Sequence, residues 1–205
     1  MHGADVEFEI QAHRGNDAIT LRRLLATRPT SLEVDVGLGQ SGLVVAHDTD
    51  LGDASGLRVE DVLAAAGDVP VMLDVKCFPP ATPDRSSFLA ALRPYLDRVS
   101  ICSFDERLVA AIAHRRTPAT LLFEAPLRTA TSAATLGPRR DLVTRELVAA
   151  AHCSGARVVP WTVNDAREMA ALVELGVDGL VTDRPALAHA VLADRLGGQE
   201  RRSVA

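Results

Sequence analysis

The chain of 205 residues lacks several features that mark common protein classes. Aromatic residues make up only 3% of it, so stacking platforms for nucleic-acid bases are missing. The net charge of −5 leaves no basic stripe for displacing counterions from a phosphate backbone. These shortages argue against a nucleic-acid partner. They favour a small molecule or a lipid headgroup as the substrate.

Long apolar segments and paired cysteines are missing as well. No run approaches the roughly 20 apolar residues that a membrane-spanning helix needs. Residues 1–10 carry acidic side chains where a signal peptide would have an apolar stretch. Cys77, Cys102 and Cys153 are odd in number and never spaced Cys-x-x-Cys, so we expect reduced, buried thiols. We therefore expect a cytoplasmic protein without a membrane span, and the sequence leaves its oligomeric state open.

Lysine is the scarcest cation. Lys76 is the only lysine among the 22 basic residues, and it ends the triplet Asp74-Val75-Lys76. Arginine and lysine are not interchangeable where a compact point charge must fit a small anionic group. A lysine kept beside a carboxylate in a chain that otherwise uses arginine therefore indicates either a structural ion pair with Asp74 or a phosphate-binding position.

The composition, 47% hydrophobic and 24% charged, is typical of a soluble globular protein. We expect one domain over residues 1–196 and a flexible tail over 197–205. The periodicity predicts strands at Glu7–His13, Ser31–Val36, Leu43–His47, Pro70–Lys76, Arg98–Phe104, Thr120–Ala125, Arg157–Val163 and Gly179–Asp183. It predicts helices at Ala18–Thr27, Val59–Ala66, Pro83–Leu96, Glu106–His114, Arg145–Ser154, Ala166–Leu175 and Pro185–Leu196. Asp105, Thr144, Asp165 and Asp183 are the expected helix N-caps.

Strands that alternate with helices predict a parallel sheet, either an open doubly wound sheet or a closed barrel. The open form would need a glycine-rich turn after the first strand, where this chain has His13-Arg14-Gly15. Chemically active residues instead follow many strands, as they do on the C-terminal face of a barrel. We therefore predict a compact α/β fold, a (β/α)8 TIM barrel. It would be irregular around 127–141, where one strand must fit into Ala133–Gly137.

Three acidic side chains mark a candidate metal site. Glu33 and Asp35 are two residues apart on a strand and so point to the same face. Asp74 ends a later strand in a similar apolar setting. Carboxylates from separate strands make an oxygen-only cage that suits Mg²⁺ or Ca²⁺. Lys76, on the same face as Asp74, would donate to a phosphate oxygen.

Two histidines mark a candidate acid–base pair. His13 and His47 each follow a run of strand residues, which predicts that both lie at one rim of the barrel. Histidine changes its charge near neutral pH and therefore suits proton transfer. Arg14 offers a forked donor for phosphate. Glu124, at the end of another strand, would also face this rim.

The chain resembles the glycerophosphodiester phosphodiesterase family, within the phospholipase C-like phosphodiesterase barrels. The motifs that carry the resemblance are Ala12-His13-Arg14-Gly15, Glu33-Val34-Asp35, Val45-Ala46-His47-Asp48, Asp74-Val75-Lys76, Ser103-Phe104-Asp105, Pro160-Trp161-Thr162-Val163-Asn164, Gly176-Val177-Asp178-Gly179 and Thr182-Asp183-Arg184-Pro185. They stand in family order and span nearly the whole chain. The resemblance implies metal ligands at Glu33, Asp35 and Asp74, catalytic histidines at His13 and His47, phosphate contacts at Arg14 and Lys76, and an aromatic pocket wall at Trp161.

Three departures separate the chain from the family pattern. Asn16-Asp17-Ala18 stands where the family usually has Pro-Glu-Asn, and the connection after the second histidine lacks the usual insertion, which predicts a shallower, more open pocket. Asp74 replaces the usual glutamate, a feature that is similar to sphingomyelinase D-type enzymes. Those enzymes are lyases that form a cyclic phosphate.

We therefore predict a metal-dependent phosphodiesterase that cleaves a small glycerophosphodiester-like substrate to a phosphomonoester and an alcohol. One divalent cation is the expected cofactor, with His13 as base and His47 as acid. The alternatives are a lyase or biosynthetic phosphoryl-transfer enzyme that forms a cyclic phosphate, and a catalytically silent phosphate-binding regulatory protein.

Overall fold

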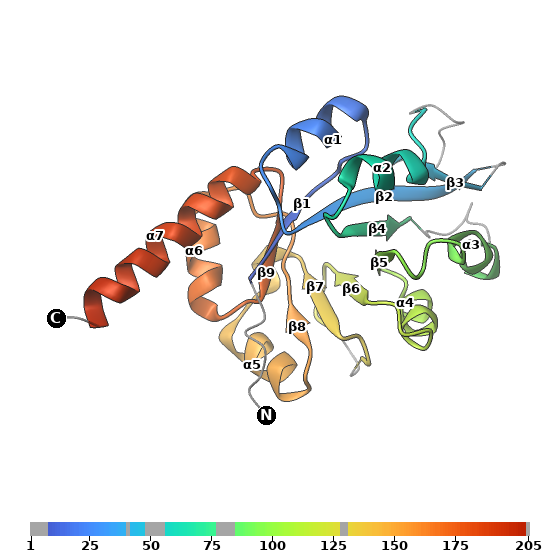
Figure 1. The fold of residues 1–205 in the computed structure, drawn as a ribbon. Helices are drawn as coiled ribbons and strands as arrows, with labels where there is room; N and C mark the ends of the chain where they lie inside the picture. Colours follow the sequence, from blue (N-terminus) through green and yellow to red (C-terminus); the bar gives the residue numbers. More distant parts are fainter. Residues whose placement is uncertain (1–7, 40–41, 48–55, 77–84, 128–130, 204–205) are drawn as a thin grey trace.

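A computed structural model describes residues 8–39, 42–47, 56–76, 85–127 and 131–203, without the side chains of residues 196–203. Strands and helices alternate along the chain (Figure 1). The strands are β1 (Glu9–Ala12), β2 (Ser31–Gly39), β3 (Gly42–Val45), β4 (Val71–Val75), β5 (Val99–Ser103), β6 (Ala119–Phe123), β7 (Thr135–Pro138), β8 (Arg157–Val158) and β9 (Gly179–Thr182). The helices are α1 (Ala18–Leu25), α2 (Val59–Ala66), α3 (Arg85–Leu92), α4 (Glu106–Ala113), α5 (Arg145–Cys153), α6 (Ala166–Leu175) and α7 (Pro185–Ser203), with a 3₁₀ turn at Arg140–Leu142.

Eight parallel strands form a nearly closed barrel in the order β8-β7-β6-β5-β4-β2-β1-β9. Backbone hydrogen bonds join its two ends. The amide of Asp178 donates to the carbonyl of Val158 at 2.8 Å, and the amide of Val181 donates to the carbonyl of Pro160 at 2.9 Å. The predicted (β/α)8 barrel is therefore confirmed.

One predicted strand lies outside the barrel. The segment predicted as Leu43–His47 forms β3, which pairs antiparallel with the far end of β2 and extends past the barrel as a hairpin. A parallel connection needs a crossover of a dozen or more residues, and too few residues separate β2 from β3 for one. The remaining barrel strand is β7, which lies in the region expected to be irregular and overlaps the predicted Ala133–Gly137.

The strand predicted as Arg157–Val163 is regular only over β8. Pro160 has no amide hydrogen, so it cannot continue the ladder. The chain nevertheless stays extended along its neighbours, because the amide of Val159 donates to Leu136 at 2.8 Å and the amide of Val163 donates to Val181 at 2.9 Å. This extended segment carries Trp161 to the rim of the barrel.

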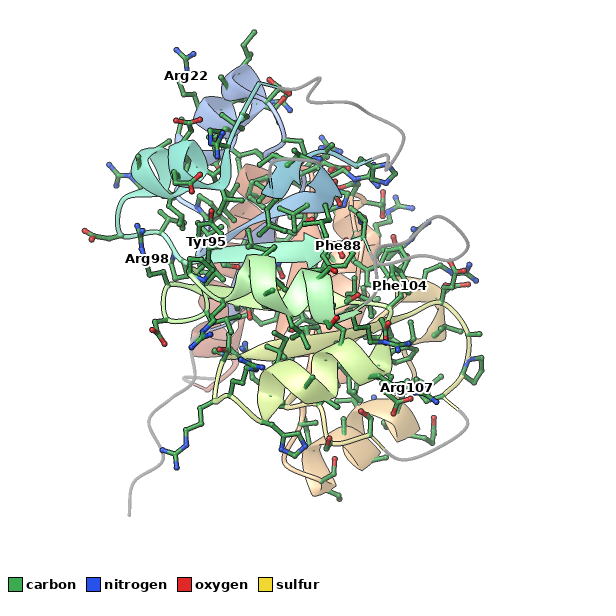
Figure 2. All side chains as sticks on the ribbon, turned by 90° about the vertical axis from the view of Figure 1, so that its right-hand side faces the viewer. Arg22, Phe88, Tyr95, Arg98, Phe104 and Arg107 are labelled. Carbon is green, nitrogen blue, oxygen red and sulfur yellow. The ribbon has the colours of Figure 1, made fainter. Side chains whose placement is uncertain are left out.

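Two apolar clusters lie on the two sides of the barrel wall. The larger packs the outward side chains of the strands, such as Val34 and Leu73, against the helices. Phe88 of α3 is one of its fully buried members (Figure 2). The smaller cluster consists of Met72, Cys102 and Leu122, with Phe104 and Trp161 packed against it. Met72, Cys102 and Leu122 alternate along their strands with residues of the outer cluster. Their side chains therefore point to the inside of the barrel.

Three of the four predicted N-caps are confirmed: the side chains of Asp105, Thr144 and Asp165 accept hydrogen bonds from the first turns of α4, α5 and α6. The prediction for Asp183 is wrong. The amide of Arg184 is bound by the Thr182 hydroxyl at 3.0 Å, and the Asp183 carboxylate is held by other side chains. It is therefore available for a different role, described below.

The helix α7 continues to Ser203, so the backbone is helical where we predicted a flexible tail; the tail's flexibility and the domain boundary at residue 196 stay predictions. Cys102 is buried as predicted, the prediction is wrong for Cys153, which is exposed, and Cys77 lies outside the described residues. Among the helices that the structure describes, none is both long enough and apolar enough to traverse a bilayer. The cytoplasmic location stays a prediction.

Candidate active site

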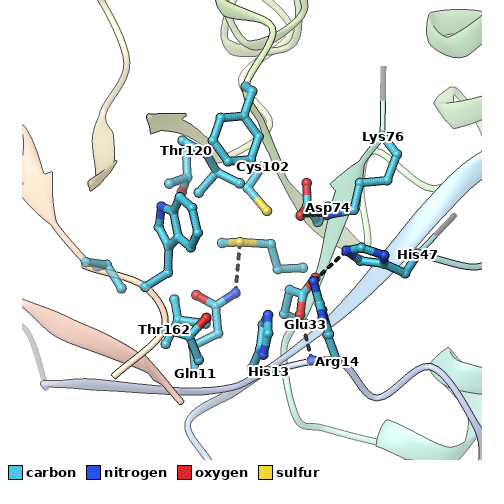
Figure 3. Close-up of a pocket in the computed structure, with 16 residues that line it drawn as sticks. Gln11, His13, Arg14, Glu33, His47, Asp74, Lys76, Cys102, Thr120 and Thr162 are labelled. Carbon is cyan, nitrogen blue, oxygen red and sulfur yellow. Dashed lines mark hydrogen bonds and ion pairs between the residues drawn. The ribbon is translucent and has the colours of Figure 1, made fainter. Parts of the chain in front are cut away.

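A pocket of about 530 Å³ opens where the carboxyl ends of the barrel strands meet. All the predicted site residues except Asp35 line it (Figure 3). Asp35 is fully buried. The lining residues are Gln11, His13, Arg14, Glu33, His47, Met72, Asp74, Lys76, Cys102, Phe104, Thr120, Leu122, Val159, Trp161, Thr162 and Val181. Glu124 is exposed and is not among them.

The three predicted metal ligands meet in one buried cluster. Asp35 on β2 is the register partner of Asp74 on β4, and Glu33 lies two residues before Asp35 on the same face. One carboxylate oxygen from each lies within 4.8 Å of the others. Their exposed fractions are 3% for Glu33, 0% for Asp35 and 7% for Asp74. Strand alternation and parallel pairing therefore create the acidic cage that the sequence indicated.

Lys76 is the buried cation of this cluster. Its ammonium lies 2.6 Å from Oδ1 of Asp35 and also donates to Oδ2 of Asp74. Burial alone would lower the pKa of Lys76, but the two carboxylates outweigh it and raise that pKa. Lys76 thus pairs with two of the three buried carboxylates, so the cluster with all three groups ionised would hold more negative charge than this ammonium balances.

The pKa values of the three carboxyl groups reflect this crowding of negative charge. Burial, followed by repulsion from Asp35 and Asp74, raises the pKa of Glu33 well above its usual range. Burial also raises the pKa of Asp74, against the opposing effect of Lys76. For Asp35, Lys76 and Asn16 overcome burial and lower the pKa. Shifted pKa values of this kind are typical of carboxylates that are held close together to bind a cation.

Three buried carboxylate oxygens of the cluster have no hydrogen-bond partner among the described residues: Oε1 of Glu33, Oδ1 of Asp35 and Oδ1 of Asp74. Oδ1 of Asp35 still has the ammonium of Lys76 as an ion-pair partner, so the oxygens of Glu33 and Asp74 are the two left without either contact. Buried polar atoms are nearly always satisfied, so each unpaired oxygen requires a reason. Carboxylate oxygens are the ligands that hard divalent cations prefer. The residues therefore fit a divalent ion.

Arg14 connects the acidic cluster to His47. Its backbone is in the left-handed region, with φ of 58°, and its amide donates to Oε2 of Glu33 at 2.7 Å. Its guanidinium lies 3.5 Å from Asp35 and donates from Nη2 to Nε2 of His47 at 2.5 Å. Arg14 thus binds Glu33 through its backbone amide and carries its guanidinium, a group suited to binding phosphate, at the rim of the pocket.

His47 reaches the rim by a route that the sequence did not indicate. We expected it to follow a barrel strand, but it follows β3, which runs back toward the barrel. The amide of Ala46 donates to the carbonyl of Asp35 at 3.1 Å, so the hairpin places His47 above the acidic cluster. The prediction that both histidines share one rim is confirmed for this reason.

His13 lies at the end of β1 and is held by Asp183 at the end of β9. Its Nδ1 is 2.7 Å from Oδ1 of Asp183. Burial lowers the pKa of His13, and the Asp183 hydrogen bond only partly reverses this. The Asn164 amide donates to the other oxygen, Oδ2 of Asp183, at 2.6 Å. Although burial opposes ionisation of Asp183, the bonds from His13 and Asn164 lower its pKa.

The wall opposite the acids is apolar. Trp161 stands edge-on to Phe104, with ring centroids 5.4 Å apart and planes at 89°. The indole Nε1 donates to the carbonyl of Gly137 at 2.8 Å, which fixes the ring. A Cβ at position 137 would lie 2.6 Å from the Leu122 side chain, so glycine leaves room for this wall.

Sequence reasoning missed three residues that support the site: Asn16, Asn164 and Asp183. Asn16 appeared only as a departure from the family pattern, yet its amide holds Asp35. Asn164 and Asp183 belonged to recognised motifs without a role, and Asp183 was interpreted as a helix cap. Strand-end position was the available signal, but their partners lie far away in the sequence. The predicted openness of the pocket depends on residues 48–55, which lie outside the described residues.

Residues 80–187, more than half of the chain, match the model of the Glycerophosphoryl diester phosphodiesterase family. The chain belongs to this family. As a member it is a phosphoric diester hydrolase with the family's TIM-barrel fold. The family is metal-dependent, in agreement with the buried acidic cluster able to bind a divalent ion.

A curated relative and two solved structures agree with this assignment. The chain is 27% identical over 231 residues to a Mycobacterium tuberculosis protein named Probable glycerophosphodiester phosphodiesterase 2, covering 93% of this chain and 80% of that protein. A glycerophosphodiester phosphodiesterase from Parabacteroides distasonis shares the fold with a TM-score of 0.76 at 18% identity, covering 93% and 99% of the two chains. An Oleispira antarctica phosphodiesterase in complex with the product sn-glycerol-3-phosphate has a TM-score of 0.75 at 15% identity, covering 90% and 96%.

Proposed function

We propose that this chain hydrolyses a small glycerophosphodiester to a phosphomonoester and an alcohol, using one divalent cation and two histidines. The observation that carries the proposal is the position of His13 and His47 at one pocket mouth, beside the buried carboxylate cluster. Family membership supports the reaction class. The glycerol phosphate product bound by the Oleispira antarctica relative supports a glycerol phosphate product here.

Glu33, Asp35 and Asp74 would hold the cation, either Mg²⁺ or Ca²⁺, through carboxylate oxygens. The unpartnered oxygens of Glu33 and Asp74 support this role. A cation bound there would supply positive charge to the phosphoryl oxygens as negative charge builds up on them. Lys76 and Arg14 would donate to the non-bridging oxygens of the same phosphate.

His13 has the arrangement of a general base. When Nδ1 donates its proton to Asp183, the lone pair of the neutral ring is on Nε2. The lowered pKa of His13 keeps the ring neutral near pH 7, which a base requires. In our proposal His13 takes a proton from the attacking water as the new oxygen–phosphorus bond forms.

His47 would act as the acid. It now accepts a hydrogen bond from Arg14 at Nε2, so that nitrogen carries no proton in this state. When the substrate phosphate takes over the Arg14 hydrogen bond, Nε2 can bind a proton. His47 then delivers this proton to the alcohol oxygen as the phosphorus–oxygen bond breaks. The two histidines thereby exchange protonation states over the reaction, and water restores them.

Trp161 would bound the space for the alcohol part of the substrate. It lines the pocket together with Phe104, and its hydrogen bond to Gly137 fixes its orientation. An aromatic edge-to-face pair provides a rigid apolar wall. The pocket is thus polar where the phosphate would bind and apolar where the rest of the substrate would lie.

The test is turnover of a glycerophosphodiester followed by ³¹P NMR, with Mg²⁺, with Ca²⁺ and with chelator. We expect a phosphomonoester signal with at least one cation and none with chelator. A cyclic phosphodiester product would establish the lyase alternative. Tight phosphate binding without turnover under any condition would establish the silent regulatory alternative. Equal turnover with chelator would exclude the cation.

A further inference from the structure

Asn164 joins the segment that follows β8 to the end of β9. Its side-chain oxygen, Oδ1, accepts the backbone amide of Asp183 at 2.9 Å and the hydroxyl of Thr182 at 3.0 Å. Its side-chain nitrogen, Nδ2, donates to Oδ2 of Asp183 at 2.6 Å. The other oxygen of that carboxylate, Oδ1, lies 2.7 Å from Nδ1 of His13. Asn164 therefore reaches the ring of the proposed base through one intervening carboxylate.

Backbone amides fix the direction of these hydrogen bonds. A backbone amide can only donate, so the atom of Asn164 that faces the amide of Asp183 has to be the oxygen. The amide of Arg184 donates to Oγ1 of Thr182 at 3.0 Å, so the proton of this hydroxyl is directed to Asn164. A reversed carboxamide would place its NH₂ group against both donors. The nitrogen of Asn164 must therefore point to the carboxylate of Asp183.

This orientation determines the tautomer of His13. Although burial opposes ionisation, the hydrogen bonds from His13 and Asn164 lower the pKa of Asp183, and an ionised carboxylate only accepts. Nδ1 must then carry the proton of the neutral ring, which leaves the lone pair on Nε2. The backbone of His13 is held at the same place, because its amide donates to the carbonyl of Thr182 at 3.0 Å.

We propose that Asn164 is a positioning residue that sets the tautomer of His13 through Asp183. Asn164 does not line the pocket, so it acts through the carboxylate and not on the substrate. An imidazole without such a partner populates both tautomers, and the one with its proton on Nε2 cannot act as a base there. The inference rests on the proposed function, in which His13 accepts a proton at Nε2.

The test uses ¹⁵N NMR of the histidine rings, which reports the tautomer without turnover. Asn164→Asp keeps the acceptor oxygen for Thr182 and for the amide of Asp183, but it replaces the donor to the carboxylate with an oxygen. We expect wild type to show one Nδ1–H signature for His13 and the variant to lose it. The kcat should fall about tenfold, the effect of one hydrogen bond, and KM should change little.

Exchanging the two side chains provides a rescue. In Asp183→Asn alone, the amide of Asn164 holds the new oxygen, so the new NH₂ group faces His13 and forces Nδ1 to accept. We expect the Nε2–H tautomer in this variant. In the double variant Asn164→Asp with Asp183→Asn, the new carboxylate at position 164 accepts that NH₂ group, and the amide oxygen at position 183 faces His13. The Nδ1–H signature should return, with kcat about tenfold above that of Asp183→Asn alone.

Two controls separate this role from a general loss of stability. Thr117→Val removes a buried hydrogen bond away from the pocket, from the Thr117 hydroxyl to the carbonyl of Leu96 at 3.1 Å. It should leave the His13 signature and kcat unchanged. His152 faces Asp178 through Nε2 at 2.9 Å, and its signals should stay at their wild-type positions in every variant.

The outcomes distinguish this inference from the proposed function. If wild type cleaves no glycerophosphodiester while the tautomer of His13 follows the substitutions, the proposed function fails and the role of Asn164 stands. A wild-type His13 signature in Asn164→Asp overturns that role. If Asn164→Asp does not fold, the comparison of Asp183→Asn with the double variant decides, and the Nε2–H tautomer in both overturns the inference.

Discussion

Asn16 binds Asp35 through both the oxygen and the nitrogen of its side-chain amide. Its Oδ1 accepts the backbone amide of Asp35 at 2.9 Å, and its Nδ2 donates to Oδ2 of the carboxylate at 2.5 Å. The residue stands where the chain departs from the family's usual Pro-Glu-Asn stretch. The departure therefore still includes an asparagine that orients a candidate metal ligand, as supporting residues around metal sites do.

Asn16→Ala removes both of these hydrogen bonds. We expect the free energy of unfolding to fall by about 1–3 kcal/mol, because a buried carboxylate loses a donor. Divalent cation affinity should fall about 10–100-fold, since Asp35 is no longer oriented. Urea denaturation and calorimetric titration measure the two effects. Cation affinity that matches the wild type would mean that Asn16 does not support a metal site.

His13→Ala and His47→Ala should each lower kcat by about 10²–10⁴, the usual contribution of a general acid or base. Steady-state kinetics on a glycerophosphodiester measures the loss. The exposed His114 is a matched control, and His114→Ala should leave kcat unchanged. Activity within a few-fold of wild type in either site variant would remove that histidine from the mechanism.

The His13–Asp183 pair predicts a pH effect with a defined sign. Burial lowers the pKa of His13, so the base is protonated and activity declines as the pH falls through this lowered pKa. Asp183 raises the pKa of His13, and Asp183→Asn should therefore shift this acidic limb to lower pH. The plateau rate should also fall, by up to about 10⁴-fold, because the ring loses its orienting partner.

A second histidine–aspartate pair provides the control for this pH experiment. His152 and Asp178 lie 2.9 Å apart and do not line the pocket. Asp178→Asn should therefore keep the wild-type pH profile of kcat/KM. An unshifted acidic limb in Asp183→Asn, or the same shift in Asp178→Asn, would contradict the role of Asp183.

Glu33→Gln removes a carboxylate whose pKa is raised by burial and by its acidic neighbours. Without a divalent cation we expect the variant to have a higher Tm than wild type, because repulsion in the cluster is relieved. Added Mg²⁺ or Ca²⁺ should raise the Tm of wild type and have little effect on the variant, since only native-state binding stabilises. Differential scanning fluorimetry records both. An equal cation-induced increase in the Tm of the two proteins would exclude Glu33 as a ligand. The control is Glu106→Gln, at an exposed helix position, which should respond to the cation as the wild type does.

Lys76→Met leaves Asp35 and Asp74 without their buried cation. Removing one partner of a buried ion pair costs about 3–5 kcal/mol, and we expect a loss of this size in chemical denaturation without metal. A divalent cation should restore part of the loss, because it compensates the same charges. A variant as stable as wild type would show that Lys76 does not balance these carboxylates.

The local pattern of the sequence already determined much of this protein. Alternating apolar residues placed Glu33 and Asp35 on one face, and the strand–helix alternation predicted the barrel that gathers strand ends at one rim. The N-caps Asp105, Thr144 and Asp165 were predictable because a cap depends on only a few neighbouring residues. The same period of two could not show that Leu43–His47 would fold back on β2, since pairing direction depends on the connection and on the whole sheet.

Only the tertiary structure decided which distant side chains meet. Asp183 has the spacing of a helix cap, yet a residue 170 positions away in the chain, His13, takes its carboxylate. Gln11 is indistinguishable in the sequence from a polar surface position on a strand, but closure of the barrel turns it into the pocket. Periodicity acts over neighbours along the chain, whereas hydrogen bonds across a barrel depend on closure, register and twist. The sequence pattern therefore determined which strand ends carry chemically active side chains, and the fold determined which of these side chains bind one another.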